Sequence, residues 1–197
     1  MKIVRILLGS FFVYQAPFFG NQLYGALVTI DTVLVGDAGN AADFTGAGAV
    51  PYEFSIGKYE TTISQYITFL NSVASTSSDS HLLNLWNSNM TNVSFVAGIS
   101  RSGSGTIGDP YAYAPIGSSD RPSAYVSWLG AARLSNWLHN GATDGASTET
   151  GAYTLNGATS GYFSRETGAT WWIPSDDEWY KSAYYTSLRQ IFGFCKI

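Results

Sequence analysis

The sequence carries little charge and only one cysteine. Its 197 residues include ten Lys or Arg and fourteen Asp or Glu, so that 12% of the chain is charged and the net charge is −4. The basic residues form no cluster, which excludes a cationic nucleic-acid interface, and no nucleic acid partner is expected. The single cysteine, Cys195, excludes a disulfide within the chain. No internal repeat or low-complexity tract occurs, which excludes a repeat architecture.

Aromatic residues and glycine are abundant instead. Aromatic residues make up 15% of the chain, glycine occurs 21 times, and 45% of the residues are hydrophobic. This hydrophobic content is enough for the core of one domain of ordinary size. With so few charges, the surface must consist largely of Ser, Thr, Asn, Gly and Tyr. Such a composition indicates a loop-rich exported protein rather than a cytosolic enzyme.

The N-terminal segment has the pattern of a secretory leader. Lys2 and Arg5 precede the apolar run Ile6–Phe19, and small residues follow. We expect residues 1–26 to be a signal peptide cleaved after Ala26, with export to the periplasm or the extracellular space. The run is too short and interrupted for a membrane span, so no stable span is expected in the mature chain. A buried N-terminal strand is the alternative interpretation.

A strand followed by a capped helix is predicted within Ala169–Tyr185. Trp171–Ile173 is a short apolar run suited to a buried strand, and Pro174 ends it because proline lacks a backbone donor. Ser175 is the expected N-cap, and Glu178 completes a capping box with it. Capping and the helix dipole explain the acidic residues here, so we do not interpret them as catalytic or as metal ligands.

Alternating hydrophobicity predicts strands over Leu27–Val35 and Tyr52–Tyr59. The residues between them, 36–51, have the composition of a surface loop. A calcium site at Asp37, Asn40 and Asp43 is less favoured, because the glutamate that closes an EF-hand loop is missing. A helix capped by Thr61 or Thr62 follows, with Ile63, Tyr66, Ile67, Leu70 and Val73 at helical spacing.

A second long helix is predicted over Trp128–His139, after a short strand at residues 121–127. Gly141 is the expected stop of this helix, and His139 is interpreted as a helix-end histidine rather than a general base. The expected apolar stripe comprises Trp128, Ala131, Leu134 and Leu138.

The remaining segments have no sustained hydrophobic period. Residues 81–117 predict an irregular but packed segment, and His81 is expected at the surface because it lacks metal-ligand partners. The glycines of Gly98–Gly105 are not a phosphate loop, since no Gly-Lys-Ser/Thr follows them. Residues 143–168 predict a polar connector with a strand-like piece at Gly151–Leu155.

Three ordered motifs resemble the sulfatase-modifying-factor family, whose founding members are the formylglycine-generating enzymes. FSIGKYETTISQYITFL resembles the family's opening FxIGKYEVTNxQYxxFL. RPSAYVSWLGAARLSNWL is similar to RPVxxVSWxDAxxYxxWL, with Gly130 in place of Asp. WWIPSDDEWYKSAYY is similar to RLPTExEWEYAA, with Ser175 in place of Thr. The resemblance implies that the matched positions serve the fold; they are Glu60, Arg121, Pro122, Trp128, Trp137, Pro174, Ser175, Glu178 and Trp179.

The resemblance implies an irregular, loop-rich α+β fold related to the C-type lectin fold. Residues 27–188 would form a partial, C-terminally truncated domain of the exported bacterial branch, and residues 189–197 a divergent tail. The family's enzymes hold copper(I) with a cysteine pair beyond the third motif and bind calcium in the same later part. Neither cofactor is expected in this chain, because Cys195 alone cannot supply two thiolates.

The sequence therefore leads to two functional hypotheses. The favoured one is an exported, non-catalytic domain of this type, with a binding or structural role and a protein or glycan as ligand. The alternative is a fragment of a copper-dependent formylglycine-generating oxidoreductase that acts on a sulfatase cysteine. No catalytic, cofactor-binding or metal-binding residue is assigned, and whether the chain is an enzyme stays open.

Overall fold

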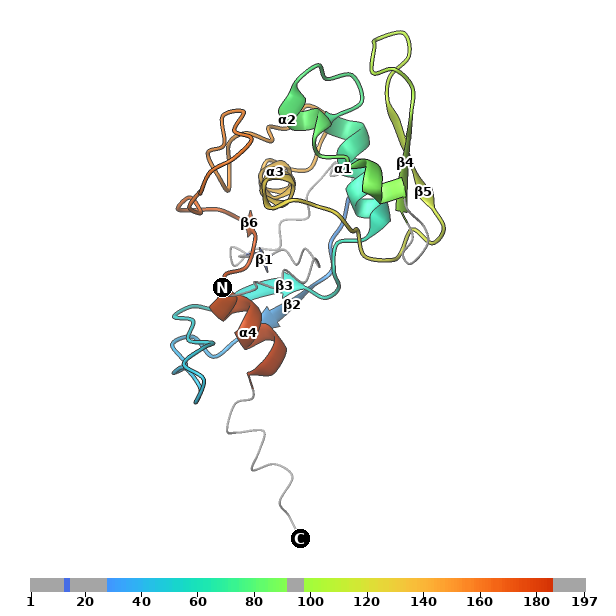
Figure 1. The fold of residues 1–197 in the computed structure, drawn as a ribbon. Coiled ribbons are helices and arrows are strands. Elements are labelled where there is room, and N and C mark those ends of the chain that lie inside the picture. The colour runs from blue at the N-terminus through green and yellow to red at the C-terminus, as the bar shows by residue number, and fades with distance from the viewer. Residues whose placement is uncertain (1–12, 15–27, 92–97, 186–197) are drawn as a thin grey trace, which may run out of the picture.

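Short strands and helices alternate along the chain in the computed structural model, which describes residues 13–14, 28–91 and 98–185 (Figure 1). The result is a mixed α/β domain, in agreement with the coarse expectation of helices and strands together. The elements are β1 (Val13–Tyr14), β2 (Thr32–Val35), β3 (Phe54–Gly57), α1 (Ile63–Val73), α2 (Ser80–Leu83), the 3-10 helix η1 (Ser88–Thr91), β4 (Gly98–Ser102), β5 (Ala112–Ile116), α3 (Trp128–His139), β6 (Trp171–Trp172) and α4 (Asp176–Tyr184).

The larger sheet has four antiparallel strands in the order β2-β3-β1-β6. Val13 of β1 is paired with Ile56 on one side and with Trp172 on the other. This placement corresponds to the N-terminal-strand alternative for the leader segment. The remaining residues of 1–26, with the expected cleavage site after Ala26, lie outside the described residues, as does the tail 189–197.

An antiparallel hairpin, β4 and β5, forms the second sheet and lies beside α1 (Figure 1). A Cβ on Gly103, at the end of β4, would lie 2.1 Å from the Pro110 carbonyl oxygen, so only glycine fits there. The expectation of an irregular segment over residues 81–117 is therefore wrong in part, because it also contains α2 and η1. Strand pairing across the hairpin supplies regularity that the Gly- and Ser-rich sequence does not show by itself.

Helix α3 is the centre of the core. Its residues from Gly130 to Leu138 are all buried, so that the helix is covered on every side. Trp137 packs on Phe69 of α1 with ring centroids 5.5 Å apart. Ala132 of α3 belongs to a second buried cluster, which includes Trp172 of β6 and Phe54 of β3. The helix thereby joins the α1 side of the molecule to the four-stranded sheet.

The predicted bounds of α3, Trp128–His139, are confirmed. Ser127 caps its start by accepting the Gly130 amide, and Gly141 follows its end with φ +98°, as a C-terminal stop requires. The prediction that Trp128 belongs to the buried apolar stripe is wrong, because Trp128 is 43% exposed. The short strand at residues 121–127 is not formed either, since only a single bridge joins Pro122 to Thr62.

Of the two expected caps, Thr61 and Thr62, the structure has Thr62 as the N-cap of α1, in a capping box in which Thr62 and Gln65 exchange hydrogen bonds. The two strands predicted before it are shorter than expected, because regular pairing is confined to Thr32–Val35 and Phe54–Gly57. Gly151–Leu155, predicted to be strand-like, forms no strand and begins with bends instead. The loop expected over residues 36–51 has no regular element.

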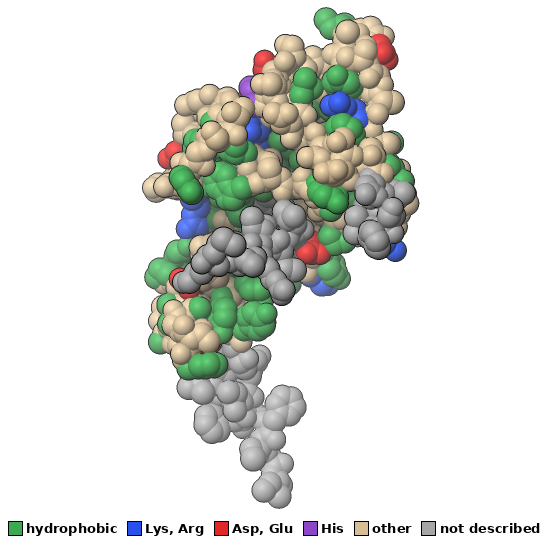
Figure 2. All heavy atoms as spheres, viewed as in Figure 1, with side chains coloured by type: hydrophobic (Ala, Val, Ile, Leu, Met, Phe, Trp, Pro, Cys, Tyr) green, Lys and Arg blue, Asp and Glu red, His purple; other side chains and the backbone are tan. Residues whose placement is uncertain are grey.

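Basic side chains lie singly on the face shown in Figure 2, without a cationic patch. In the described part of the chain, no helix combines the length and apolarity needed to cross a bilayer. Several aromatic side chains are exposed, including Trp128 and the fully exposed Tyr162.

Candidate functional site

The β6–α4 junction has the local structure that the sequence predicts. Trp171 and Trp172 are buried, and α4 begins directly after Ser175. The Ser175 hydroxyl accepts the Glu178 amide at 3.2 Å, and the Glu178 carboxylate accepts the Ser175 amide at 2.7 Å. This reciprocal pair satisfies two amides at the helix start that have no partner within the helix.

Glu178 also has a second role that the capping motif does not reveal. Its carboxylate is 1% exposed and accepts the Tyr52 hydroxyl at 2.6 Å and Arg165 Nη1 at 2.8 Å. The indole Nε1 of Trp172 lies 3.1 Å from both oxygens of the carboxylate. A loop before β3, the connector before β6 and the start of α4 therefore meet at one buried carboxylate.

The surroundings of Glu178 keep it ionised. Burial raises the pKa of this carboxyl, but hydrogen bonds from Tyr52, Arg165 and the Ser175 amide together outweigh burial and hold the pKa below 4.5. A carboxylate with this many donors is charged at neutral pH and has no proton to give. It organises the site and does not act as a general acid.

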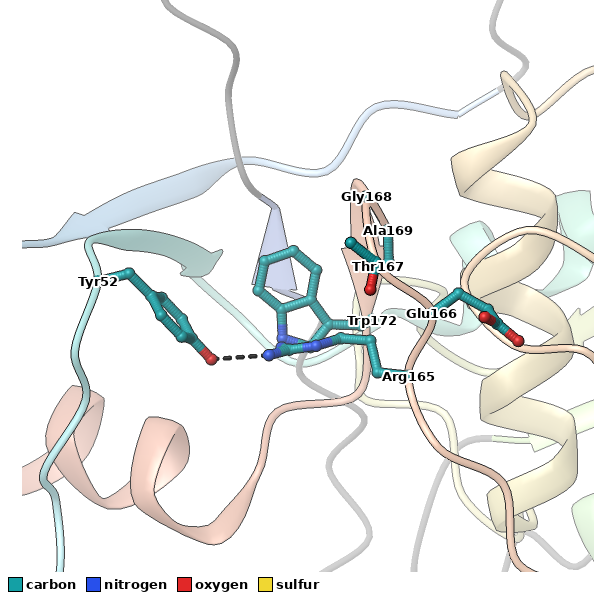
Figure 3. Close-up of a pocket in the computed structure, with 7 residues that line it drawn as sticks. All are labelled: Tyr52, Arg165, Glu166, Thr167, Gly168, Ala169 and Trp172. Carbon is teal, nitrogen blue, oxygen red and sulfur yellow. Dashed lines mark hydrogen bonds between the residues drawn. The ribbon is translucent and has the colours of Figure 1, made fainter.

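A polar cavity of about 320 Å³ opens beside this carboxylate (Figure 3). The guanidinium of Arg165 lies between the Tyr52 hydroxyl and the Trp172 ring, 4.4 Å from the centre of that ring. Arg165 thus combines an ion pair with a cation–π contact. The lining residues are Tyr52, Arg165, Glu166, Thr167, Gly168, Ala169 and Trp172.

One wall of the cavity is a tight turn over residues 166–169. The Ala169 amide donates to the Glu166 carbonyl at 3.2 Å, and Gly168 has φ +85°, a conformation that favours glycine at the third position of such a turn. The Glu166 amide donates to the Ala152 carbonyl at 2.9 Å, and the Thr154 hydroxyl donates to the Glu166 carboxylate at 2.8 Å. These contacts attach the turn to the residues that precede it.

Arg165 retains donors that no described residue uses. Nη1 donates to Glu178, and Nη2 donates to the Tyr52 hydroxyl at 2.7 Å. The Nε proton and one proton on each terminal nitrogen have no acceptor within the described ranges of the chain. The side chain is 34% exposed, so these donors can reach a molecule in the cavity. Burial lowers the Arg165 pKa, but the hydrogen bonds that Arg165 donates to Glu178 and Tyr52 produce a net increase, and the group stays cationic.

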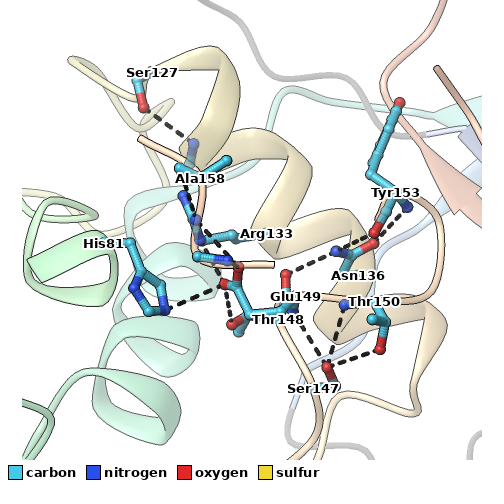
Figure 4. A network of polar contacts seen from close by, with 12 residues as sticks. His81, Ser127, Arg133, Asn136, Ser147, Thr148, Glu149, Thr150, Tyr153 and Ala158 are labelled. Atoms are coloured by element: carbon cyan, nitrogen blue, oxygen red, sulfur yellow. Dashed lines mark hydrogen bonds and ion pairs between the residues drawn. The ribbon is translucent and has the colours of Figure 1, made fainter. Parts of the chain in front are cut away.

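A second polar network attaches residues 147–158 to α3 (Figure 4). Arg133, which is 2% exposed, pairs with Glu149 through Nε at 2.7 Å, and the Gly157 amide donates to the same carboxylate at 2.6 Å. Asn136 donates to the Thr148 and Tyr153 carbonyls, and its own oxygen accepts the Tyr153 amide at 2.7 Å. All of these polar atoms are satisfied within the protein, so the network is structural.

His81 belongs to this second network, contrary to the expectation of a surface histidine. Its side chain is only 18% exposed, and Nε2 lies 3.6 Å from Glu149. The fold brings together a short helix and a connector that the sequence separates widely. Nδ1 of His139, the other histidine, accepts the Thr170 amide at 3.1 Å and lies 2.9 Å from the Thr170 hydroxyl, and burial lowers the His139 pKa.

The residues matched to the family motifs are distributed over the fold. Glu178, Ser175 and Pro174 lie at the junction beside the cavity, and Trp137 is fully buried in the core. Arg121 and Pro122 hold the start of α1, where the Arg121 carbonyl accepts the Ile63 amide at 2.8 Å. Glu60 and Trp179 are half-buried away from the cavity, and Trp128 is at the surface.

Sequence reasoning missed Tyr52 and Arg165. Both lie outside the three motifs, and no local pattern marks a lone arginine in a polar connector as the partner of a helix-capping glutamate. The one available signal was chemical. A capping glutamate that follows a buried strand in sequence has carboxylate oxygens that can accept further hydrogen bonds, and an arginine can donate them.

Within the described residues, no group of three His, Cys, Asp or Glu side chains comes together as a metal site. In the loop considered for calcium, the Asn40 side chain donates to the Gly48 carbonyl, and Asp43 accepts hydrogen bonds from Thr45 and Tyr180. These contacts agree with the preferred interpretation of a surface loop. Cys195 lies outside the described residues.

The family resemblance depends on the sequence motifs alone. Comparison with protein-family models, with curated proteins and with solved structures finds no significant match to this chain. A function for the protein therefore has to follow from the chemistry of its own residues.

Proposed function

We propose that this chain is an exported, sulfatase-modifying-factor-like domain that binds a ligand in the Arg165 cavity and does not perform catalysis. The motifs around Glu60, Trp128 and Trp179 support the family, and the irregular, lectin-related α+β fold is part of the same proposal. The observation that carries the binding function is the set of Arg165 donors that no described residue accepts, at the wall of an open cavity. Such donors, next to an aromatic ring, are typical of small-ligand sites.

The chemistry of the site favours binding over catalysis. Glu178 is the strongest candidate for a catalytic carboxylate, but four groups already donate to it, so its oxygens have little capacity left for a substrate proton. Tyr52 donates to Glu178, and burial together with that carboxylate raises the pKa of its hydroxyl. A tyrosine with a raised pKa is a poor base at neutral pH.

Arrays of immobilised saccharides and peptides test the binding function with the full-length chain and its Arg165→Lys variant. Lysine keeps a positive charge beside Glu178 but lacks the planar fork of donors, so the variant should fold and lose its ligand. We expect at least one array member to bind the wild type and to be lost by the variant. Equal binding of all array members by both proteins would refute a ligand site at Arg165.

Export is proposed from Lys2, Arg5 and the apolar run that follows them. N-terminal sequencing of the protein from culture supernatant and from a periplasmic extract should show a mature chain that begins near Leu27. A chain that retains Val13 and Tyr14 would instead keep β1 between β3 and β6. That outcome would refute cleavage after Ala26 and leave the binding function unaffected.

A further inference from the structure

The charges around Arg165 restrict the kind of ligand that the cavity can take. Glu178, 2.8 Å from Arg165, already compensates the guanidinium charge, and Glu166 lines the same cavity. The local net charge is therefore negative, and an anionic ligand would be repelled by the two carboxylates. What remains favourable is a neutral molecule that offers acceptor oxygens to the unused Arg165 donors.

The cavity also offers acceptors for a ligand's own donors. One Glu166 carboxylate oxygen accepts the Thr154 hydroxyl, and the other has no donor among the described residues. In Figure 3 the Glu166 carboxylate points away from the Arg165 guanidinium. The two groups would therefore contact different parts of a bound molecule. The Thr167 hydroxyl, on the turn that follows Arg165 and also lines the cavity, has no hydrogen bond in the described part of the chain. Hydroxyl groups, which both donate and accept, match this mixture.

An exposed aromatic surface adjoins the cavity. The Trp128 ring stacks nearly parallel on Phe163, at an angle of 16° with centroids 6.1 Å apart, and meets Tyr153 edge-on at 5.3 Å. Phe163 precedes Arg165 by two residues, and the Tyr153 hydroxyl accepts the amide of Ile173 at 3.0 Å, directly after the cavity residue Trp172. Trp128 is 43% exposed at the start of a helix that is buried from Gly130 to Leu138, and its ring offers an apolar face to a ligand.

We infer that the Arg165 cavity and the adjoining Trp128–Phe163 surface bind a neutral saccharide chain. One sugar ring occupies the cavity, with its hydroxyl groups on Arg165, Thr167 and Glu166, and a neighbouring ring lays its C–H face on Trp128. A cavity of about 320 Å³ lies near the lower limit of about 300 Å³ for small-ligand sites, which fits one ring rather than a long segment. This inference rests on the proposed binding function and specifies its ligand.

A peptide fits this site less well. Peptide segments that bind in extended form gain specificity from pockets for alternate side chains, and those pockets are usually apolar. The cavity instead is lined by polar side chains and by the small residues Gly168 and Ala169, while Arg165 covers a face of Trp172. A saccharide has hydroxyl groups that can pair with Arg165, Thr167 and Glu166, whereas an apolar peptide side chain would leave these polar groups unpaired.

Isothermal titration calorimetry of the full-length protein tests the inference with three sets of probes. These are neutral oligosaccharides of glucose, galactose, mannose and N-acetylglucosamine, their sulfated counterparts, and unstructured peptides of mixed composition. The variants are Arg165→Lys, Thr167→Ala and Trp128→Ala, with Tyr162→Ala as the matched control. Tyr162 is a fully exposed aromatic residue outside the cavity. Circular dichroism and thermal melting establish that each variant is folded.

We expect a neutral oligosaccharide to bind the wild type and the Tyr162→Ala protein equally. Each lost hydrogen bond or stacking contact should weaken binding about three- to tenfold in Thr167→Ala and Trp128→Ala, and Arg165→Lys should abolish it. Binding of sulfated probes alone, or of peptides alone with the same Arg165 dependence, would overturn the saccharide inference but retain the binding function. Failure of every probe to distinguish wild type from Arg165→Lys would overturn both.

Discussion

The Tyr52 hydroxyl donates to the Glu178 carboxylate at 2.6 Å across 126 positions of sequence. The same hydroxyl accepts a hydrogen bond from Arg165, so the three side chains form a closed arrangement at the base of the cavity. The arrangement couples the start of α4 to the loop that leads into β3. A residue that caps a helix therefore also positions the proposed ligand site.

Replacing Tyr52 by phenylalanine should destabilise the protein by about 2 kcal/mol. The change removes one charge-assisted hydrogen bond to Glu178 and leaves Arg165 Nη2 without its acceptor. Urea unfolding followed by tryptophan fluorescence measures the loss. Tyr162→Phe is the matched control, because Tyr162 is fully exposed, and it should leave the unfolding free energy unchanged. Equal stability of both variants would contradict the role assigned to Tyr52.

Acid should destabilise the fold through Glu178 and Glu149. In both carboxyls burial raises the pKa, but hydrogen bonds outweigh it, so each folded pKa lies below the ordinary value of 4.5. The unfolded state then binds protons at a higher pH than the folded state. The stability that these two carboxylates contribute is fully present above about pH 4.5. It is lost as the pH falls through their lower pKa values in the folded state.

Urea unfolding at a series of pH values between about 7 and about 3 measures this dependence. The Glu178→Gln variant should lose about 3 kcal/mol at neutral pH, because Arg165 keeps its charge without a partner. Its stability should also fall less steeply in acid than that of the wild type. Parallel acid profiles for the two proteins would show that Glu178 has an ordinary pKa in the folded state.

Ser175→Ala should cost about 1 kcal/mol, because it removes the acceptor for the Glu178 amide at the start of α4. Asp176→Asn is the comparison, since Asp176 is exposed and contributes through the helix dipole, for which we expect a smaller loss of about 0.5 kcal/mol. Thermal melts of both variants measure the effect. An unchanged melting temperature for Ser175→Ala would count against this helix start.

Ser123→Ala should be neutral or slightly stabilising. The Ser123 hydroxyl is buried and has no hydrogen-bond partner in the described part of the chain. Ser135→Ala is the matched comparison, because the equally buried Ser135 hydroxyl donates to the Ala131 carbonyl at 3.0 Å. We expect a loss of up to about 1 kcal/mol for Ser135→Ala alone in urea unfolding. A larger loss at Ser123 would mean that its hydroxyl has a partner in the folded protein.

The chain should not convert cysteine to formylglycine. The chemistry that the family resemblance implies needs copper(I) between two thiolates, and Cys195 is the single cysteine of this sequence. Incubation of the protein with copper(I), oxygen and a peptide containing CxPxR should leave the cysteine unchanged in mass spectrometry. Aldehyde formation that disappears in Cys195→Ser would overturn the non-catalytic proposal.

Local chemistry was sufficient to predict the capped helices. The hydroxyl of Ser175 and the carboxylate of Glu178 are three positions apart, and the same holds for Thr62 and Gln65, so each cap depends only on neighbouring residues. The bounds of α3 followed from Gly141 and the apolar residues before it, and the Ser127 cap, which was not predicted, is equally local. These interactions are short in sequence and therefore visible in it.

Only the tertiary structure decided which residues share the site. Tyr52, Arg165 and Glu178 come from three distant segments, and no periodicity links them. The hairpin β4–β5 was missed for the same reason, because its regularity comes from pairing between strands. The sequence by itself determined where α1, α3 and α4 begin, since a cap acts within one turn. Burial and long-range hydrogen bonding, which depend on the whole fold, determined that a helix-capping glutamate binds the cavity residues Tyr52 and Arg165, and that Arg165 keeps donors that no described residue accepts.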